Sequence, residues 1–350
     1  MPQRTLASLA VALGATLLAA APAQAASRPE PLAPDALFAR VASSVVFIEV
    51  QRPDGADVGS GVVLHADGFV VTAAHVVEGS SSISVVFVDG HREPATVATL
   101  SRTEDLALLA VKALPPTTFV ATLADSDELV VGQPVYCIGA PLGLRHTLTT
   151  GIVSAIRDNY GSELSLSPRH VIQTDASINQ GTSGGALFDR FGRVVGIASF
   201  IASRSGGSVG LGFAVPSNIV RRRLFDEAIP YVGLVLRRVP APLAAVLHWP
   251  YPESLLVEKV EAGSPAARAG FVGGVVPTDF AGFRVLMGGD LIVRVGPYGF
   301  DEPDKVHALL HGLGEGDHVA YTVLRAGKLV PVDLVLGPVI RVPALGRDRR

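Results

Sequence analysis

The sequence has 350 residues, 48% of them hydrophobic, and a formal net charge of -3 from 29 basic and 32 acidic side chains. This length exceeds what one ordinary hydrophobic core organises, so about two domains are expected. The charge is nearly balanced and no long run has a single sign, which argues against a nucleic-acid partner. Each of the two domains is therefore expected to have its own function.

The N-terminus has the pattern of a secretory signal. Arg4 precedes an apolar stretch over residues 6–21, and Ala23, Gln24 and Ala25 form a small-x-small cleavage pattern. The alternative is an uncleaved anchor, but the stretch is shorter than the roughly 20 residues that span a bilayer. We expect residues 1–25 to be removed, and the mature chain to be periplasmic without a stable membrane span.

The predicted elements after the signal begin with a short helix at 36–42 and a strand at 44–50, which is rich in β-branched residues. Short apolar runs separated by turn residues follow, at a spacing typical of an all-β barrel or sandwich. These runs are residues 61–64, 69–72, 83–88, 106–111, 135–138, 147–156, 170–174, 194–200 and 210–215.

A helix over 219–228, capped by Ser217 or Asn218, then ends the β-rich region. Prolines break up the next stretch, and a mixed pattern of strands with two helical segments continues to about residue 337. The predicted organisation is a signal peptide (1–25), a β-rich domain (26–222), a linker (223–231), a second domain (232–338) and a disordered tail (339–350).

Cysteine and histidine usage argues against disulfides and metals. Cys137 is the only cysteine, and its apolar neighbours indicate a buried strand thiol. The histidines other than His75 share no ligand spacing, and even His307 and His311, one helical turn apart, have no matched partner. We expect neither a metal nor a cofactor.

Three residues carry candidate chemistry. His75 follows a strand end, where a general base can be held rigidly, although a lone histidine is usually structural. Asp105 begins a strand and would orient an imidazole. Ser183 is flanked by glycines that let backbone amides converge, as an oxyanion hole requires. The alternative is that these glycines only form a tight turn. Each signal alone is weak, but their His, Asp, Ser order within one β-rich unit is not easily assigned to chance.

With these motifs the chain resembles the HtrA/Deg family of trypsin-like serine proteases. The resemblance implies a mainly β chymotrypsin-like double β-barrel followed by one α+β PDZ domain. It rests on residues 59–63, 72–77, 105–109, 139–144, 150–154, 174–185 and 212–218.

The resemblance also implies roles for particular residues. His75, Asp105 and Ser183 would form the catalytic triad, and the amides of Gly181, Thr182 and Ser183 would line the oxyanion hole. The family usually has Asn where this chain has Thr182. Because the main chain lines the hole, we expect activity to survive this difference.

The positions that match the specificity pocket are uncharged. They are Ser177, Ile178, Ser199, Phe200 and Ile201. An uncharged pocket disfavours a buried unpaired cation, so we expect cleavage after small or medium aliphatic residues.

The second domain resembles a PDZ domain at its carboxylate-binding loop. Tyr231, Val232, Gly233 and Leu234 match the loop whose amides receive a peptide C-terminus. An insertion-like stretch over 272–286 departs from the family pattern.

The sequence therefore predicts an exported, ATP-independent serine endopeptidase that degrades unfolded or damaged proteins, binds peptide C-termini and forms a homotrimer or higher oligomer. Two alternatives remain at this point. One is a PDZ-bearing chaperone or binding protein with little protease activity, and the other is a regulatory protease with one signalling substrate.

Overall fold

The computed structural model describes most of the chain after residue 29. The described residues are 30–52, 55–102, 104–140, 146–160, 169–201, 208–226, 231–238, 244–245, 249, 251, 253–280, 283–311, 313–337, 342–343 and 345. The expected signal peptide, residues 1–25, lies outside them. No helix in this described part is long and apolar enough to cross a bilayer.

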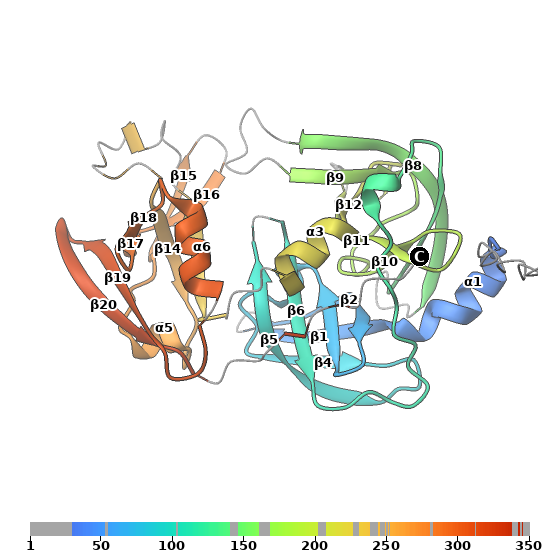
Figure 1. Ribbon diagram of the computed structural model, residues 1–350, viewed down its shortest axis with the longest axis horizontal. Coiled ribbons are helices and arrows are strands. Elements are labelled where there is room, and N and C mark those ends of the chain that lie inside the picture. The colour runs from blue at the N-terminus through green and yellow to red at the C-terminus, as the bar shows by residue number, and fades with distance from the viewer. Residues whose placement is uncertain are drawn as a thin grey trace, which may run out of the picture. The chain divides into compact units, whose positions relative to one another are not determined.

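The first half of the β-rich region is a closed antiparallel barrel of six strands in the order β1-β2-β3-β6-β5-β4 (Figure 1). Its strands are β1 (Val45–Arg52), β2 (Gly55–His65), β3 (Phe69–Thr72), β4 (Ser82–Val86), β5 (Arg92–Ser101) and β6 (Leu106–Val111). Helix α1 (Pro34–Val41) and the turn η1 (Ala42–Ser44) precede it, and the one-turn helix α2 (Ala74–Val77) follows β3.

The second half is another closed six-stranded barrel, in the order β10-β11-β12-β9-β8-β7. Its strands are β7 (Pro134–Gly139), β8 (Thr147–Tyr160), β9 (Arg169–Thr174), β10 (Ala186–Phe188), β11 (Val194–Ile201) and β12 (Gly212–Pro216), with the turn η2 (Ser126–Glu128) before them. The mainly β double-barrel fold predicted from the sequence is confirmed.

The most apolar strands read as continuous apolar runs because they serve two cores. In β6, Leu106 and Leu108 face the core shared by both barrels, while Ala107 and Leu109 fill the first barrel. Strand side chains alternate between faces with a period of two, so burial on both faces leaves no polar positions. The second barrel divides its strands between the shared core and an interior core in the same way.

The helix after β12 begins earlier than predicted. Helix α3 (Ser217–Arg221) continues into a π-turn, η4 (Arg222–Asp226). The predicted capping role was wrong, because Pro216 is the N-cap and no side chain caps the helix. The Ser217 hydroxyl donates instead to the carbonyl of Ala124 at 2.7 Å. Leu224 and Phe225 are buried in the shared core, so residues that we assigned to the linker belong to the first domain.

The C-terminal region is a separate α+β unit with its own core. Its sheet has the order β13-β14-β17-β19-β20, with β18 paired to β17. The elements are β13 (Leu234–Arg238), β14 (Leu255–Val260), α5 (Pro265–Arg268), β17 (Leu291–Val295), β18 (Tyr298–Gly299), α6 (Pro303–His311), β19 (His318–Arg325) and β20 (Lys328–Val335). Helix residues such as Ala266 and Val306 pack with sheet residues such as Val257 and Val323 in one cluster.

The insertion-like stretch forms a β-hairpin. Strands β15 (Val276–Phe280) and β16 (Phe283–Met287) pair only with each other among the described strands. In the predicted tail, Val342 and Leu345 are partly buried against the core shared by the barrels, so disorder does not describe these two residues.

Candidate active site

His75 and Asp105 lie together at the end of the first barrel. His75 is the second residue of α2, and its Nδ1 lies 3.0 Å and 2.9 Å from the two carboxylate oxygens of Asp105. A carboxylate has only acceptors, so the Nδ1 that faces it carries the proton and Nε2 is left as the acceptor. The His75 side chain is half exposed while that of Asp105 is buried. Buried Asp105 thus orients the imidazole, and the exposed side of the ring is accessible to a substrate.

Asp105 also binds the main chain that carries His75. Its carboxylate accepts from the His75 amide at 3.0 Å, and its carbonyl accepts from the Ala74 amide at 3.1 Å. The backbone of Asp105 has a φ of 59°. This left-handed conformation is uncommon outside glycine but is tolerated by Asp and Asn. The turn before β6 therefore directs both polar groups of Asp105 toward α2.

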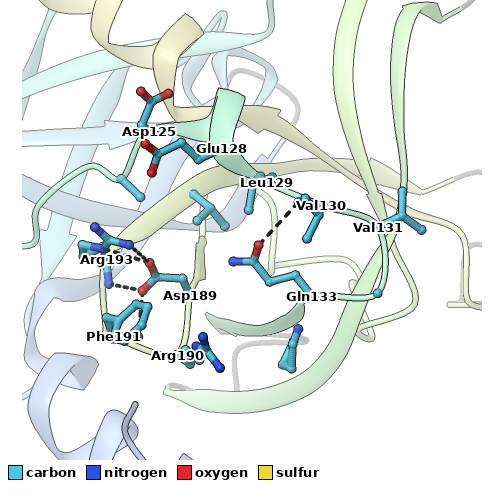
Figure 2. Close-up of a pocket in the computed structure, with 14 residues that line it drawn as sticks. Asp125, Glu128, Leu129, Val130, Val131, Gln133, Asp189, Arg190, Phe191 and Arg193 are labelled. Atoms are coloured by element: carbon cyan, nitrogen blue, oxygen red, sulfur yellow. Dashed lines mark hydrogen bonds and ion pairs between the residues drawn. The ribbon is translucent and has the colours of Figure 1, made fainter. Parts of the chain in front are cut away.

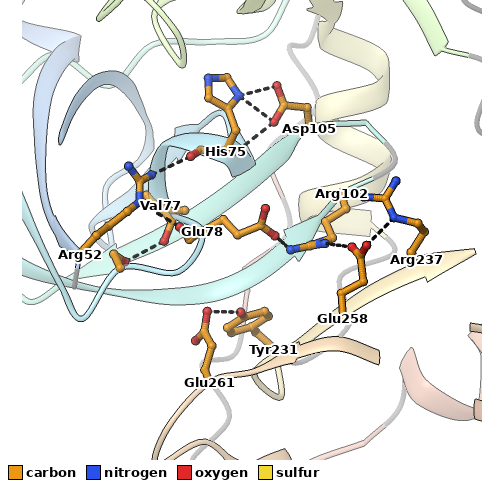
Figure 3. A network of polar contacts seen from close by, with 11 residues as sticks. Arg52, His75, Val77, Glu78, Arg102, Asp105, Tyr231, Arg237, Glu258 and Glu261 are labelled. Atoms are coloured by element: carbon orange, nitrogen blue, oxygen red, sulfur yellow. Dashed lines mark hydrogen bonds and ion pairs between the residues drawn. The ribbon is translucent and has the colours of Figure 1, made fainter. Parts of the chain in front are cut away.

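Arg52, at the end of β1, binds the other end of α2, as Figure 3 shows. Its guanidinium donates to the carbonyls of His75 at 2.9 Å, Val76 at 2.8 Å and Glu78 at 3.2 Å. The last carbonyls of a helix have no partner within the helix, so one side chain here satisfies three of them. This arrangement fixes the short helix from its C-terminal side.

The guanidinium of Arg52 is itself held by Asp57 at 2.5 Å. Burial tends to raise the pKa of Asp57, but the hydrogen bonds from Arg52 and the Val58 amide, together with the charge of Arg52, leave the pKa below its usual value. The pair therefore remains charged at neutral pH and keeps the guanidinium in place.

Ser183 lies in the loop that joins β9 to β10 of the second barrel. This loop contains a tight turn just before Ser183. The Thr182 amide donates to the Asn179 carbonyl at 2.9 Å, and Gly181 has a φ of 90°. A positive φ at the third position is the signature of a type II turn and favours glycine there. Within the described residues the amides of Gly181 and Ser183 donate to no partner, which leaves both available to an oxyanion.

One predicted oxyanion donor was wrong. We expected the amide of Thr182 to join those of Gly181 and Ser183. This amide is already bonded to the Asn179 carbonyl within the turn, so it has no proton to offer a substrate.

The glycines after Ser183 are required by close packing. A Cβ on Gly184 would lie 2.1 Å from the carbonyl oxygen of Ser60, and one on Gly185 would lie 2.5 Å from that of Ile138. The sequence suggested these glycines for their amide geometry. The structure adds that any side chain would collide with the first barrel or with β7.

Ser199 links the nucleophile candidate to the His75–Asp105 pair. The Ser183 hydroxyl donates to the Ser199 carbonyl at 3.1 Å, and the Ser199 hydroxyl makes a very short hydrogen bond to Asp105. In the described structure no hydrogen bond joins Ser183 to His75. We had assigned Ser199 only to the pocket wall, because its contact with Asp105 spans 94 residues of sequence.

The positions predicted for the specificity pocket differ in exposure. Ile178 is fully buried, and its Cδ1 would be 3.0 Å from a Cβ on Gly212. Phe200 stacks on Phe213 with ring centroids 4.8 Å apart. Ser177 is exposed, and its carbonyl accepts from Thr149 at 3.0 Å. The side chain of Ile201 lies outside the described ones.

A pocket lined by described residues lies elsewhere, on the second barrel. Figure 2 shows this hollow of about 550 Å³ beside the β10–β11 turn, and none of the candidate catalytic residues lines it. Its buried Asp189 is bonded to Arg193 at 2.8 Å and to two backbone amides. These contacts give the buried carboxylate of Asp189 a structural role. The described residues include no group of His, Cys, Asp or Glu placed to hold a metal ion.

The predicted peptide-binding loop of the C-terminal unit has a bend at Gly233. Gly233 has a φ of 79°, and a Cβ there would lie 2.2 Å from the Cβ of Ser264. Tyr231 donates to Glu261 at 2.8 Å, and burial together with this carboxylate raises the pKa of the phenol. Leu234 begins β13, so the loop leads directly into an edge strand of the sheet.

Comparison with known proteins places these features in a family. Residues 59–197 match the trypsin-like peptidase domain. The chain is 35% identical over 291 residues to the probable periplasmic serine endoprotease DegP-like of Halomonas elongata, covering 80% of this chain and 56% of that one. It is 35% identical over 280 residues to the periplasmic serine endoprotease DegP of Salmonella typhimurium, covering 79% and 56%.

Solved structures give the same result. The HtrA-type protease AlgW with tripeptide is 29% identical, with a TM-score of 0.51, and the match covers 87% of this chain and 97% of that one. The chain spans only 56% of the length of the curated relatives cited above.

Two antiparallel six-stranded barrels, with a His–Asp pair and a glycine-framed serine in the loops between their strands, define the chymotrypsin class of serine peptidases. Within this class the chain is similar to DegP and other HtrA-type proteases.

Proposed function

We propose that this chain is a periplasmic, ATP-independent serine endopeptidase that cleaves unfolded or damaged proteins. The observation that carries the proposal is the Asp105 carboxylate, which binds both the amide and Nδ1 of His75 and also the hydroxyl of Ser199. Ser199 in turn binds the hydroxyl of Ser183. One buried carboxylate thus orients the general base, and Ser199 connects this carboxylate to the nucleophile.

In the proposed mechanism the Ser183 hydroxyl leaves the Ser199 carbonyl and attacks the scissile carbonyl carbon. Nε2 of His75 takes the hydroxyl proton, and the unpaired amides of Gly181 and Ser183 stabilise the tetrahedral oxyanion. His75 then protonates the leaving amine as the C–N bond breaks, which leaves an acyl-enzyme. Asp105 keeps the imidazole in the required tautomer and stabilises its charged form.

Deacylation repeats the same steps with water. His75 takes a proton from a water molecule that attacks the ester carbon, and it returns the proton to the Ser183 oxygen as the C–O bond breaks. The half-exposed position of His75 gives water access to Nε2. The products are a free carboxylate and the restored hydroxyl.

The proposed substrate preference is for small or medium aliphatic residues before the cut. Phe200, which is only partly buried and stacks on buried Phe213, offers apolar surface to such a side chain, and buried Ile178 is an uncharged residue beneath the site. A lysine or arginine would lose its hydration without a partner charge from these three residues, at a cost of several kcal/mol. Unfolded chains expose aliphatic segments that folded proteins bury, which suits a quality-control role.

We further propose that residues 232–338 form a PDZ domain that binds peptide C-termini. Tyr231, Val232, Gly233 and Leu234 would receive the terminal carboxylate on backbone amides, and β13 would pair with the peptide as an added strand. The position of β13 at the edge of the sheet supports this mode. The positive φ of Gly233 is the kind of bend that turns successive amides toward one point.

Export by a cleaved signal at residues 1–25 and assembly as a homotrimer or higher oligomer complete the proposal. The relatives' names place them in the periplasm, which supports the location. Analytical ultracentrifugation of the mature chain tests assembly, and N-terminal sequencing of the exported protein tests cleavage after Ala25.

The test of the proposed activity compares the wild-type protein with Ser183→Ala on casein at increasing temperature. Only the wild type is expected to produce fragments, with cuts after Val, Ala or Ile in mass spectra. Ser44→Ala is a matched control, because Ser44 is a buried serine whose hydroxyl binds the Val41 carbonyl away from the site. Equal fragment patterns from wild type and Ser183→Ala contradict the proposal and favour a binding protein without protease activity.

A further inference from the structure

Ser60 lies at the centre of the Gly59-Ser60-Gly61 segment of β2, in the first barrel, yet it is bonded to the nucleophile loop of the second. Its amide donates to the carbonyl of Ser183 at 2.9 Å, and its hydroxyl donates to the carbonyl of Gly181 at 2.7 Å. The second contact joins residues 121 positions apart in sequence. Ser60 therefore holds this loop at two successive points.

The hydroxyl of Ser60 both donates and accepts a hydrogen bond. It donates its only proton to Gly181 and accepts from the Ala140 amide at 2.9 Å, and the residue is 0% exposed. The carbonyl of Ser60 accepts from the Thr72 hydroxyl at 2.7 Å. A buried hydroxyl with a donor and an acceptor both satisfied is held in one orientation, so it can impose that orientation on the loop.

The carbonyl of Gly181 and the amide of Thr182 are two ends of one planar peptide group. The amide end donates to Asn179 at 2.9 Å and the carbonyl end accepts from Ser60 at 2.7 Å. Because the group is rigid, two bonds at its opposite ends fix its plane. A rotation of this plane would break both bonds and change the backbone angles of Gly181 and Thr182.

The amide of Ser183 belongs to the next peptide group along the chain. The group after that one begins with the Ser183 carbonyl, which accepts from the Ser60 amide at 2.9 Å. The peptide that carries the Ser183 amide is thus bracketed by two groups that Ser60 holds. The other unpaired amide, that of Gly181, adjoins the first held group. Both candidate oxyanion donors therefore lie next to peptide groups that Ser60 holds.

The packing around Ser60 leaves little room for the loop to shift. A Cβ on Gly59 would lie 2.5 Å from Val76 and 3.3 Å from the Ser183 carbonyl. A Cβ on Gly184 would lie 2.1 Å from the Ser60 carbonyl. Glycines on both sides of the contact allow the two backbones to meet, and the hydroxyl supplies the specific bond between them.

We propose that Ser60 is a positioning residue for the oxyanion hole: its hydroxyl holds the Gly181–Thr182 peptide so that the Gly181 and Ser183 amides face one point. This inference rests on the proposed peptidase activity. A merely structural serine would contribute stability alone, whereas a positioning serine contributes to the stabilisation of the tetrahedral intermediate.

The test measures kcat and KM of Ser60→Ala on a peptide that the wild type cleaves, with Ser44→Ala as the matched control. Each variant loses one buried hydroxyl bonded to a carbonyl. Removal of a whole oxyanion donor costs about 100 to 1,000-fold in kcat. Since Ser60→Ala misdirects donors without removing them, we expect kcat to fall about 10 to 100-fold, with KM within about threefold.

A peptide aldehyde provides a second readout, because its adduct with Ser183 is a tetrahedral hemiacetal that uses the same donors. Its affinity for Ser60→Ala should fall by about the same factor as kcat/KM, since a transition-state mimic follows transition-state stabilisation. The affinity of the uncleaved peptide for Ser183→Ala and for the Ser60→Ala, Ser183→Ala double variant should be equal. A structural role alone would leave the aldehyde affinity unchanged.

The outcomes separate the inference from the proposed function. If the wild type cleaves nothing, the proposed function is wrong. If the wild type cleaves and Ser60→Ala keeps a kcat within twofold of Ser44→Ala, the inference is overturned. Should Ser60→Ala fail to fold, Ser60→Cys serves, because its thiol is only a weak donor. A wild-type kcat and aldehyde affinity in that variant also overturn the inference.

Discussion

Asp105 binds His75 through both main chain and side chain. One carboxylate oxygen accepts from the His75 amide at 3.0 Å, and Nδ1 of the same residue lies within 3.0 Å of both oxygens. The carboxylate therefore fixes the position of the backbone and the direction of the ring together. Substitutions at Asp105 can separate these two effects.

Asp105→Asn is expected to lower kcat by about 1,000 to 10,000-fold while the protein stays folded. Asn tolerates the left-handed backbone at this position, so the turn should persist. The side-chain NH₂ of Asn can only donate, so an NH₂ that faces Nδ1 favours the wrong tautomer of His75. Turnover of a cleavable peptide measures the loss. Thermal unfolding within a few degrees of wild type is the control, and an unchanged kcat would contradict the assigned role.

Arg52→Ala is expected to lower kcat about 10 to 100-fold, because three carbonyls of the α2 segment lose their donor and His75 is less precisely placed. Arg52→Lys should recover only part of the loss, since one ammonium cannot reproduce the planar fork. Free guanidinium, added at concentrations that do not unfold the wild type, should partly restore kcat in Arg52→Ala and not in Arg52→Lys.

The matched control for Arg52 is Arg193→Ala. Arg193 also binds a buried partner, Asp189, but contacts none of the candidate catalytic residues. This variant should lose stability with kcat nearly unchanged. A similar fall in kcat for both variants would mean that Arg52 acts through general stability.

Gly181→Ala is expected to lower kcat at least tenfold. A φ of 90° disfavours any residue with a Cβ, so the type II turn that leaves the Gly181 amide unpaired is strained. Gly132→Ala is the control, because Gly132 has the same φ of 90° and open space around it. Both variants should lose similar stability, as measured by urea unfolding, and only the first should lose activity.

Two buried groups predict loss of stability at high pH. Burial raises the pKa of Cys137 from 9.0 to about 12 and that of Tyr321 from 10.0 to about 12. Below the pKa values of the unfolded chain, near 9 to 10, both groups contribute fully to the free energy of unfolding. This contribution is lost as the pH rises toward 12, because the unfolded chain releases protons that the folded chain keeps. The free energy of unfolding should therefore fall across this window.

Urea titrations at several pH values measure this fall. Tyr321→Phe should make the alkaline decline shallower for the C-terminal unit, and Cys137→Ala should do so for the second barrel. The Cys137 thiol should also react with a thiol reagent at pH 8 only in urea. Rapid labelling of the native protein would show that this thiol is not buried.

Much of the fold was accessible from the sequence because the barrel strands are apolar and bounded by turn residues. Strand β5 (Arg92–Ser101) was missed, since its residues alternate between exposed and partly buried up to Val97 and include a proline. Strand β10 was missed because it has only three residues, Ala186–Phe188. Strands of these kinds are defined by their partners across the sheet, which local pattern does not reveal.

The candidate site was predictable where a role belongs to a residue type and not where it depends on a distant contact. His75, Asp105 and Ser183 stood out by type and order. Ser60 did not, because its hydroxyl contact crosses 121 positions. Thr182 was assigned wrongly as a donor because the sequence does not show that its amide closes a turn with Asn179.

The most direct test of the central claim, that Ser183 is a nucleophile activated by His75 and Asp105, is covalent labelling with a fluorophosphonate followed by peptide mass spectrometry. Such a reagent reacts with a serine whose proton is removed by an adjacent base. We predict one label per chain, located on Ser183, absent from Ser183→Ala and strongly slowed in Asp105→Asn. No labelling of the folded wild type, or equal labelling of Ser183→Ala, would contradict this account.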